Sequence, residues 1–142
     1  MKKIALPLVF LALLGLCAPA LAQSWNLSAL KAQAAKAVPD GQMTNASADD
    51  AGAFVSIQAG DLNYQFTLAS DQDPQMADAE QLDYQGRTAY FFEAMPGSGG
   101  LMILLDTEKS LTILLMPGME SETDLTAADM TAIVDNMDLE AL

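Results

Sequence analysis

Three consecutive stretches of mostly apolar residues dominate the pattern of this chain, and they predict a β-meander. They cover residues 87–93, 101–106 and 110–116, and the last two are almost wholly apolar. Strands of that composition are normally covered on both faces. The connections between them are the glycine-rich residues 96–100 and the polar residues 107–109. The pattern therefore predicts strands at the centre of a sheet, covered by the rest of the chain.

More strands are predicted before this meander. Residues 53–59 and 62–69 flank Gly60-Asp61 as the arms of a hairpin. In the second arm apolar and polar residues alternate, as in a half-exposed antiparallel strand. A short strand is expected over 79–84. Residues 44–52 are small and polar, so the pattern predicts a loop there.

Helices are predicted at both ends of the strand region. Over 27–37 the apolar residues recur at helical spacing among alanines, and Asn26 or Ser24 can cap the first turn. The second helix is predicted from 127 to about 137. Its start carries the clearest local signals: Thr126 and Asp129 resemble a capping box, and Leu125 and Met130 fit a hydrophobic staple. Its apolar face consists of Met130, Ile133, Val134 and Met137.

These elements define an α+β fold. We expect a single antiparallel sheet of about five or six strands, a meander, with an N-terminal helix and a C-terminal amphipathic helix packed on it. Alternation places Leu101, Ile103 and Leu105 on one face together with Leu111, Ile113 and Leu115. The helices are the only elements available to cover the two faces. A face left open would be an apolar patch suited to a partner or a lipid.

Residues 1–22 have the pattern of a cleaved secretory signal peptide. Two lysines precede an uncharged apolar run, and Ala20-Leu21-Ala22 provides small residues at the expected cleavage site. The apolar run is shorter than the roughly 20 residues of a membrane-spanning helix. Cys17 raises the alternative of a lipoprotein, although Leu16 is a poor residue to precede a lipid-bearing cysteine. We expect a periplasmic or secreted protein whose single domain covers 23–142, with no membrane span after cleavage.

The charge of the chain is strongly negative. Nineteen acidic residues stand against six basic ones, for a net charge of −13. Such a surface repels nucleic acid and anionic lipid, so we expect no nucleic-acid partner. It favours solubility and suits a cationic partner.

The residue types that are missing restrict the chemistry. The chain has no histidine, and its one cysteine, Cys17, lies in the predicted signal peptide. Most hydrolytic triads, thiol chemistry and ordinary zinc sites are thereby excluded from the exported domain. The sequence thus predicts no catalytic residue and no cofactor. It favours a non-enzymatic binding or accessory domain, with a protein partner in the cell envelope or a cationic or apolar ligand.

Two metal-binding alternatives remain open. In an up-down-up meander Met95, Met102 and Met116 fall near the same end of the sheet, with Met119 just beyond, and several thioethers suit Cu(I). Packing is the competing interpretation, because methionine is an ordinary gap-filler. The second alternative is calcium bound by an acidic loop containing Asp71 and Asp73.

The calcium loop does not fit an EF-hand. Counted from Asp71, the sixth and twelfth positions hold Met76 and Leu82, where an EF-hand requires glycine and glutamate. Only an irregular calcium site is therefore predicted, with a solvated acidic loop as the alternative.

A carboxylate-dependent hydrolase is the remaining alternative, because acids are so frequent in the chain. Glu93, Asp106 and Glu108 stand at strand ends. That hypothesis requires two of them in one concave pocket.

Overall fold

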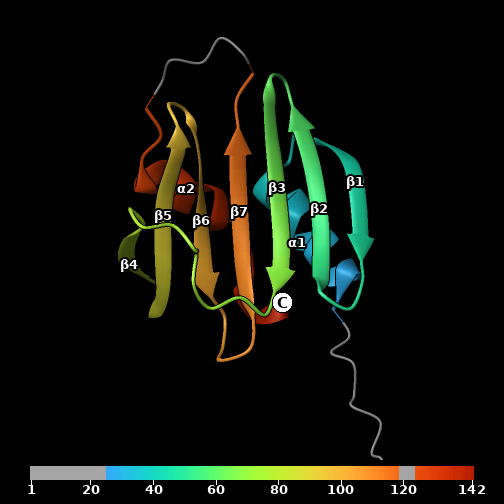
Figure 1. Ribbon diagram of the computed structural model, residues 1–142. Helices are drawn as coiled ribbons and strands as arrows, with labels where there is room; N and C mark the ends of the chain where they lie inside the picture. The colour runs from blue at the N-terminus through green and yellow to red at the C-terminus, as the bar shows by residue number, and fades with distance from the viewer. Residues whose placement is uncertain (1–24, 119–123) are drawn as a thin grey trace, which may run out of the picture.

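The computed structural model describes residues 25–118 and 124–142, and it contains one sheet and two α-helices (Figure 1). The elements follow in the order α1 (Leu27–Ala37), β1 (Gln42–Ala48), β2 (Gly52–Ala59), β3 (Leu62–Ala69), β4 (Glu80–Tyr84), β5 (Arg87–Met95), β6 (Ser98–Leu104), β7 (Ser110–Met116), α2 (Ala127–Val134) and the short 3₁₀ helix η1 (Leu139–Ala141). The α+β prediction is confirmed at this level. None of the helices among the described residues has the length and apolar character needed to cross a membrane.

The sheet is antiparallel throughout, and its seven strands lie in the order β1-β2-β3-β7-β6-β5-β4. It consists of two meanders, β1–β3 and β4–β7, which meet where β3 pairs with β7. Residues 70–79 connect the far end of β3 to the edge strand β4 and cross in front of β7 and β6 (Figure 1). The predicted hairpin of β2 and β3 and the three-stranded meander β5–β7 are both present, and the sheet exceeds the expected five or six strands.

The additional strand is β1, and the prediction of a loop over 44–52 is wrong. The segment Gln42–Ala48 pairs with β2 along its length, with a bulge between Met43 and Asn45. Its residues have little intrinsic strand preference. The pairing comes from tertiary contacts, including the Thr44 hydroxyl, which donates to the Ser56 hydroxyl at 3.2 Å.

The predicted loop over 96–100 is wrong in its second half. Ser98, Gly99 and Gly100 begin β6, and only Pro96-Gly97 forms the turn, with Gly97 at a φ of 76°. The glycines are needed here for space. A Cβ on Gly99 would lie 2.3 Å from the carbonyl oxygen of Phe92, and one on Gly100 would lie 2.5 Å from Cζ of the Phe92 ring. Close packing against β5 therefore explains why a strand carries turn-like residues.

Both helices begin where the sequence predicts. The Asn26 side chain accepts a hydrogen bond from the Ala29 backbone at 2.9 Å and caps α1. At α2, Thr126 and Asp129 form the reciprocal capping box. This helix ends at Val134, short of the predicted 137, and the backbone then turns so that Met137 is buried beyond its end.

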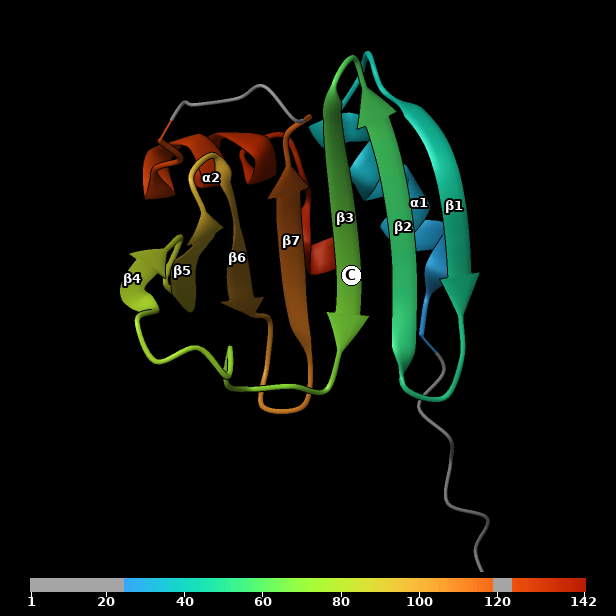
Figure 2. The ribbon, with the colours of Figure 1, turned by 45° about the horizontal axis from the view of Figure 1, so that its top comes forward.

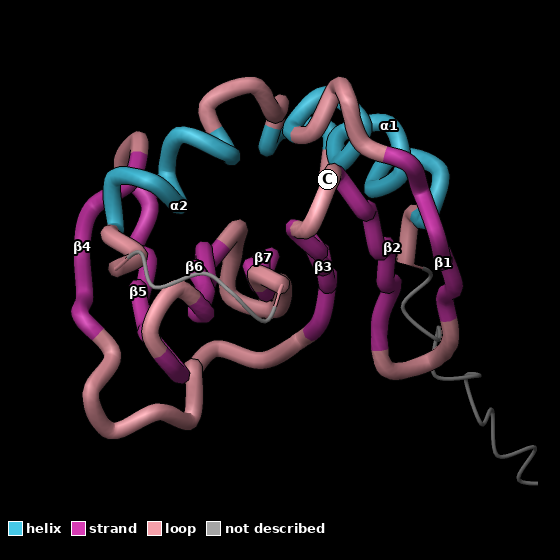
Figure 3. The backbone as a smooth tube through the Cα atoms, turned by 90° about the horizontal axis from the view of Figure 1, so that it is seen from above, coloured by secondary structure: helices cyan, strands magenta, loops and turns pink. Residues whose placement is uncertain are grey.

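Both helices lie on the same face of the sheet, as Figures 2 and 3 show. The core fills the space between that face and the helices, and its strand residues include Leu101, Ile103, Leu111, Ile113 and Leu115, as predicted. The expectation that helices cover both faces is wrong. On the second face, the connection 70–79 lies over the β5–β7 half, where it packs near Phe92 and Met102.

Candidate functional site

A sheet this wide cannot be covered by two helices side by side. Seven strands at about 4.8 Å spacing span about 29 Å, whereas two helices of about 10 Å diameter cover about 20 Å. Helix α1 packs against β1, β2 and β3, and α2 packs against β5 and β6. A seam therefore remains between the helices, over the middle of the sheet where β3 and β7 pair.

One half of this seam is filled by residues 135–142. Met137 and Leu139 are buried there in the core. The Gln33 side chain of α1, which is only 4% exposed, accepts a hydrogen bond from the Asp138 backbone at 2.8 Å. Lys109, in the β6–β7 connection, donates to the backbone oxygen of Leu142 at 2.6 Å. The C-terminal segment is thus fastened to α1 on one side and to the sheet end on the other.

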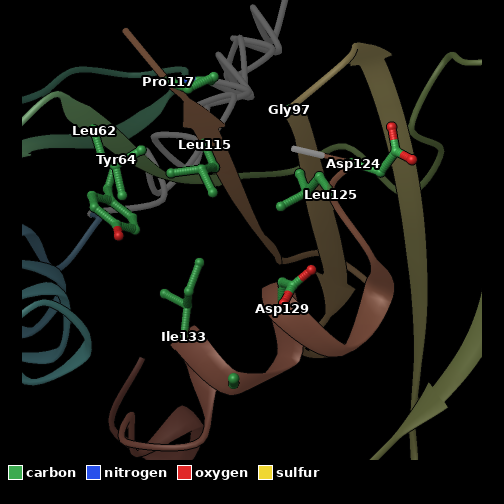
Figure 4. Close-up of a pocket in the computed structure, with 10 residues that line it drawn as sticks. Leu62, Tyr64, Gly97, Leu115, Pro117, Asp124, Leu125, Asp129 and Ile133 are labelled. Atoms are coloured by element: carbon green, nitrogen blue, oxygen red, sulfur yellow. The ribbon is translucent and has the colours of Figure 1, made fainter. Parts of the chain in front are cut away.

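The other half of the seam is a cleft of about 340 Å³, shown in Figure 4. Its walls come from the start of β3, the end of β7, the β5–β6 turn and one side of α2. The residues that line it are Leu62, Tyr64, Gly97, Leu115, Pro117, Asp124, Leu125, Asp129, Ala132 and Ile133. Its size falls at the lower end of the roughly 300–1,000 Å³ typical of small-molecule pockets.

The polar groups of the cleft are one phenol and two carboxylates. Burial raises the pKa of Tyr64, so its hydroxyl remains a neutral donor. The pKa of Asp129 is lowered, first because its carboxylate accepts from the Thr126 hydroxyl and then because it accepts from the Thr126 backbone. Asp124 adds a second exposed acid at the rim. The described lining includes no basic residue, so the cleft combines an apolar interior with a negative edge.

A second, smaller cavity of about 160 Å³ lies on the opposite face, beneath the connection 70–79. Its lining consists of Asp71, Asp73, Pro74, Gln75, Phe92, Met102 and Thr112. The predicted calcium ligands and one predicted copper ligand therefore share a cavity. They do not suit one ion, because carboxylates prefer hard cations and thioethers prefer soft ones.

The four candidate methionines are not gathered at one place. Met95, at the end of β5, is 65% exposed and pairs with Ser98. Met116 is the last residue of β7 and lies at the same end of the sheet. Met102 is 2% exposed and lies four residues after Ser98, about 13 Å along β6. The prediction that Met102 shares their end is wrong because β6 begins at Ser98 instead of Leu101. Met119 lies outside the described residues.

The candidate carboxylates of a hydrolase are also separated. Glu93 pairs with Gly99 near the start of β6, whereas Asp106 and Glu108 follow the other end of that strand. Asp106 is occupied in its own turn, where it accepts from the Glu108 backbone at 2.8 Å. Neither of the two cavities described above includes any of these three acids. Among the described residues, no three His, Cys, Asp or Glu side chains gather as a metal-binding group.

The sequence predicts the apolar character of several lining residues but not the cleft itself. The alternation of β3 put Leu62 and Tyr64 on one face, and the helical spacing put Ile133 on the apolar side of α2. No local signal shows that two helices would share one face of seven strands, which is what creates the space. Comparison with known protein families, with curated proteins and with solved structures finds no significant match.

Proposed function

We propose that this protein is an exported, non-enzymatic binding domain of the bacterial envelope, and that its ligand occupies the cleft between α2 and the sheet. The pattern of residues 1–22 supports export. The ligand is a small molecule with an apolar body and a positively charged group. This chemistry matches an apolar wall with acids at its edge.

The composition of the cleft carries the proposal. Leu62, Leu115 and Ile133 lie around the same space in Figure 4, and Tyr64 also lines it. An apolar chain placed there gains about 0.8 kcal/mol for each methylene group removed from water. A cationic group at the rim then meets the exposed carboxylate of Asp129, which the hydrogen bonds from Thr126 hold in place.

The test compares three eight-carbon probes that differ only in their head group: octylamine, octanol and octanoate. Isothermal titration should give octylamine a dissociation constant on the order of 0.1–1 mM, as expected for so small a ligand. Octanol should bind more weakly and octanoate weakest, because of the two acids. Equal binding of all three, or preference for octanoate, would contradict the proposed ligand class.

A matched pair of variants locates the binding. Ala132 lines the cleft and is exposed, so Ala132→Phe should fill the space and abolish octylamine binding. Ala128 lies on the same helix, is also exposed and does not line the cleft. Ala128→Phe should therefore bind octylamine like the wild type. Loss of binding in both variants would place the ligand elsewhere.

A further inference from the structure

The two edges of the sheet differ in the features that prevent pairing with another chain. The edge strand β4 is five residues long and carries Glu80 and Asp83. The opposite edge strand, β1, has seven residues with the sequence Gln-Met-Thr-Asn-Ala-Ser-Ala, without charge or proline. Charges, prolines and short length are the usual means of blocking an edge. Only the bulge between Met43 and Asn45, near its start, interrupts β1.

In the second half of β1, residues 46–48, no other described residue pairs with the backbone groups that face away from β2. Asp49 donates to the Gly52 oxygen at 2.9 Å in the turn that joins β1 to β2. Because hydrogen-bonded and non-hydrogen-bonded positions alternate in an antiparallel pair, the backbone groups of Ala48 and Ala46 face away from β2. The side chains here are small, namely Ala46, Ser47 and Ala48, and cannot shield these groups. A strand added beside β1 would find donors and acceptors in regular register.

Acidic residues stand at both ends of this edge. Asp40 precedes β1, and Asp49 and Asp50 follow it. Asp49 is held in place because its carboxylate accepts from the backbones of Ala51 and Gly52 at 2.8 and 3.1 Å. The nearest basic residues in the sequence, Lys31 and Lys36, belong to α1.

The charges select the occupant. A second copy paired antiparallel through β1 would bring Asp40 of each chain next to Asp49 and Asp50 of the other, which costs about 1 kcal/mol for each close pair in water. Pairing of β1 with β4 of a second copy would place Glu80 and Asp83 of that copy beside the acidic ends of β1, which is also repulsive. An extended peptide with basic residues at both ends would instead be attracted by the acids at the two ends of β1.

We propose that β1 is a docking edge for an extended peptide that has an uncharged, strand-forming centre of about five residues and Lys or Arg on each side. The peptide adds an eighth strand to the sheet, with its main chain bonded to Ala46 and Ala48. This edge lies across the sheet from β4 and is separate from the cleft beside α2, so the two proposals stand independently.

The probe is the synthetic peptide KKTVTVTVKK, titrated into the purified protein and followed by the amide NMR signals of Ala46 and Ala48. A saturable shift of these two signals is expected, with binding weakened at least about tenfold between 50 and 500 mM salt. A copy of the peptide with alternate backbone nitrogens methylated keeps every charge but loses the donors, and it should not bind. Equal binding of the methylated peptide would overturn the proposal, because it would leave charge alone as the cause.

Two variants of the protein complete the test. Ala46→Pro removes an outward-facing donor, which an edge strand tolerates, and should weaken binding at least about tenfold. Asp40→Asn with Asp50→Asn leaves the backbone intact and should weaken binding several-fold at low salt. The control, Glu80→Gln with Asp83→Asn on the opposite edge, should bind like the wild type. No saturable binding, an equal loss in the control, or a concentration-dependent dimer that excludes the peptide would each overturn the proposal.

Discussion

The side chain of Gln33 and the backbone of Asp138 join the two ends of the described chain across 105 residues of sequence. Gln33 Oε1 accepts from the Asp138 N–H at 2.8 Å, and Gln33 is buried in the surface of α1. This bond holds the segment after α2 in the seam between the helices. It explains why only one half of the seam remains a cleft.

Removing that acceptor should destabilise the protein. In Gln33→Leu the side chain keeps a similar volume, but the Asp138 N–H loses its partner. The free energy of unfolding should fall by about 1–2 kcal/mol, the cost of a partly buried donor left without a partner. Urea denaturation measures it, and the control is Ala32→Leu, which places the same new side chain at an exposed position of the same helix. Equal stability of the two variants would contradict the role given to Gln33.

A second bond, between β4 and the end of α2, predicts a pH dependence. The Tyr84 hydroxyl donates to Asp135 Oδ1 at 2.8 Å, and the pKa of Tyr84 is raised, first by burial and then by this hydrogen bond and the Asp135 charge. Above about pH 10 the unfolded tyrosine ionises while the folded one stays protonated. The unfolded state then binds fewer protons, so stability falls as the pH rises.

Tyr84→Phe should remove this contribution. At pH 7 the variant should be less stable than the wild type by about 1–2 kcal/mol, because the hydrogen bond to Asp135 is lost. Between pH 9 and 11 its stability should decline less steeply than that of the wild type. Part of the decline should remain, since burial also raises the pKa of Tyr64. Identical declines in urea denaturation at pH 9 and 11 would refute the assignment to Tyr84.

The glycines at the start of β6 predict a packing effect. Gly100→Ala would bring a methyl group to 2.5 Å from the Phe92 ring, 2.8 Å from the Ile113 carbonyl oxygen and 2.8 Å from Leu114. Overpacking of this kind costs about 1–3 kcal/mol. Adding Phe92→Leu should recover part of the loss, because it removes the nearest obstacle. Thermal unfolding measures the stability of both variants against the wild type. Wild-type stability of Gly100→Ala would show that the strand is not tightly packed there.

Export makes a separate prediction about the N-terminus. Protein recovered from the envelope or medium of an expressing bacterium should begin at Gln23, as read by intact mass and N-terminal sequencing. A chain that retains residues 1–22 would contradict the signal-peptide prediction. Lipid attached at Cys17 would instead support the lipoprotein alternative.

The elements that sequence predicts well are those with strong local signals. The capping box of Thr126 and Asp129 predicts the start of α2, and the alternation of apolar and polar residues over 62–69 predicts a strand that is buried on one side, as Phe66 and Leu68 are. The errors fall where a distant contact decides. Strand β1 exists because β2 pairs with it, and Ser98–Gly100 form a strand because they pair with β5, where Gly99 and Gly100 approach Phe92 closely.

The candidate site depends even more on distant contacts. The apolar residues that line the cleft can be recognised from the pattern of their own elements. The space between them exists only because α1 and α2 lie on the same face of the sheet. The C-terminal segment then determines which half of the seam stays open. None of these arrangements follows from residue patterns within one element. The metal candidates show the converse, because Met95 and Met102 are predicted to lie close together only if residues 98–100 form a loop.

Binding in the cleft beside α2 is tested by following methyl NMR signals during a titration with octylamine. Saturable shifts are expected for Leu62, Leu115 and Ile133, which line the cleft, while Leu30 and Val55, buried in the core on the α1 side, should stay unchanged. In Ala132→Phe these shifts should disappear. Saturable shifts confined to Leu114 and Met116, on the other face of the sheet, or no saturable shift at all, would contradict binding in the cleft.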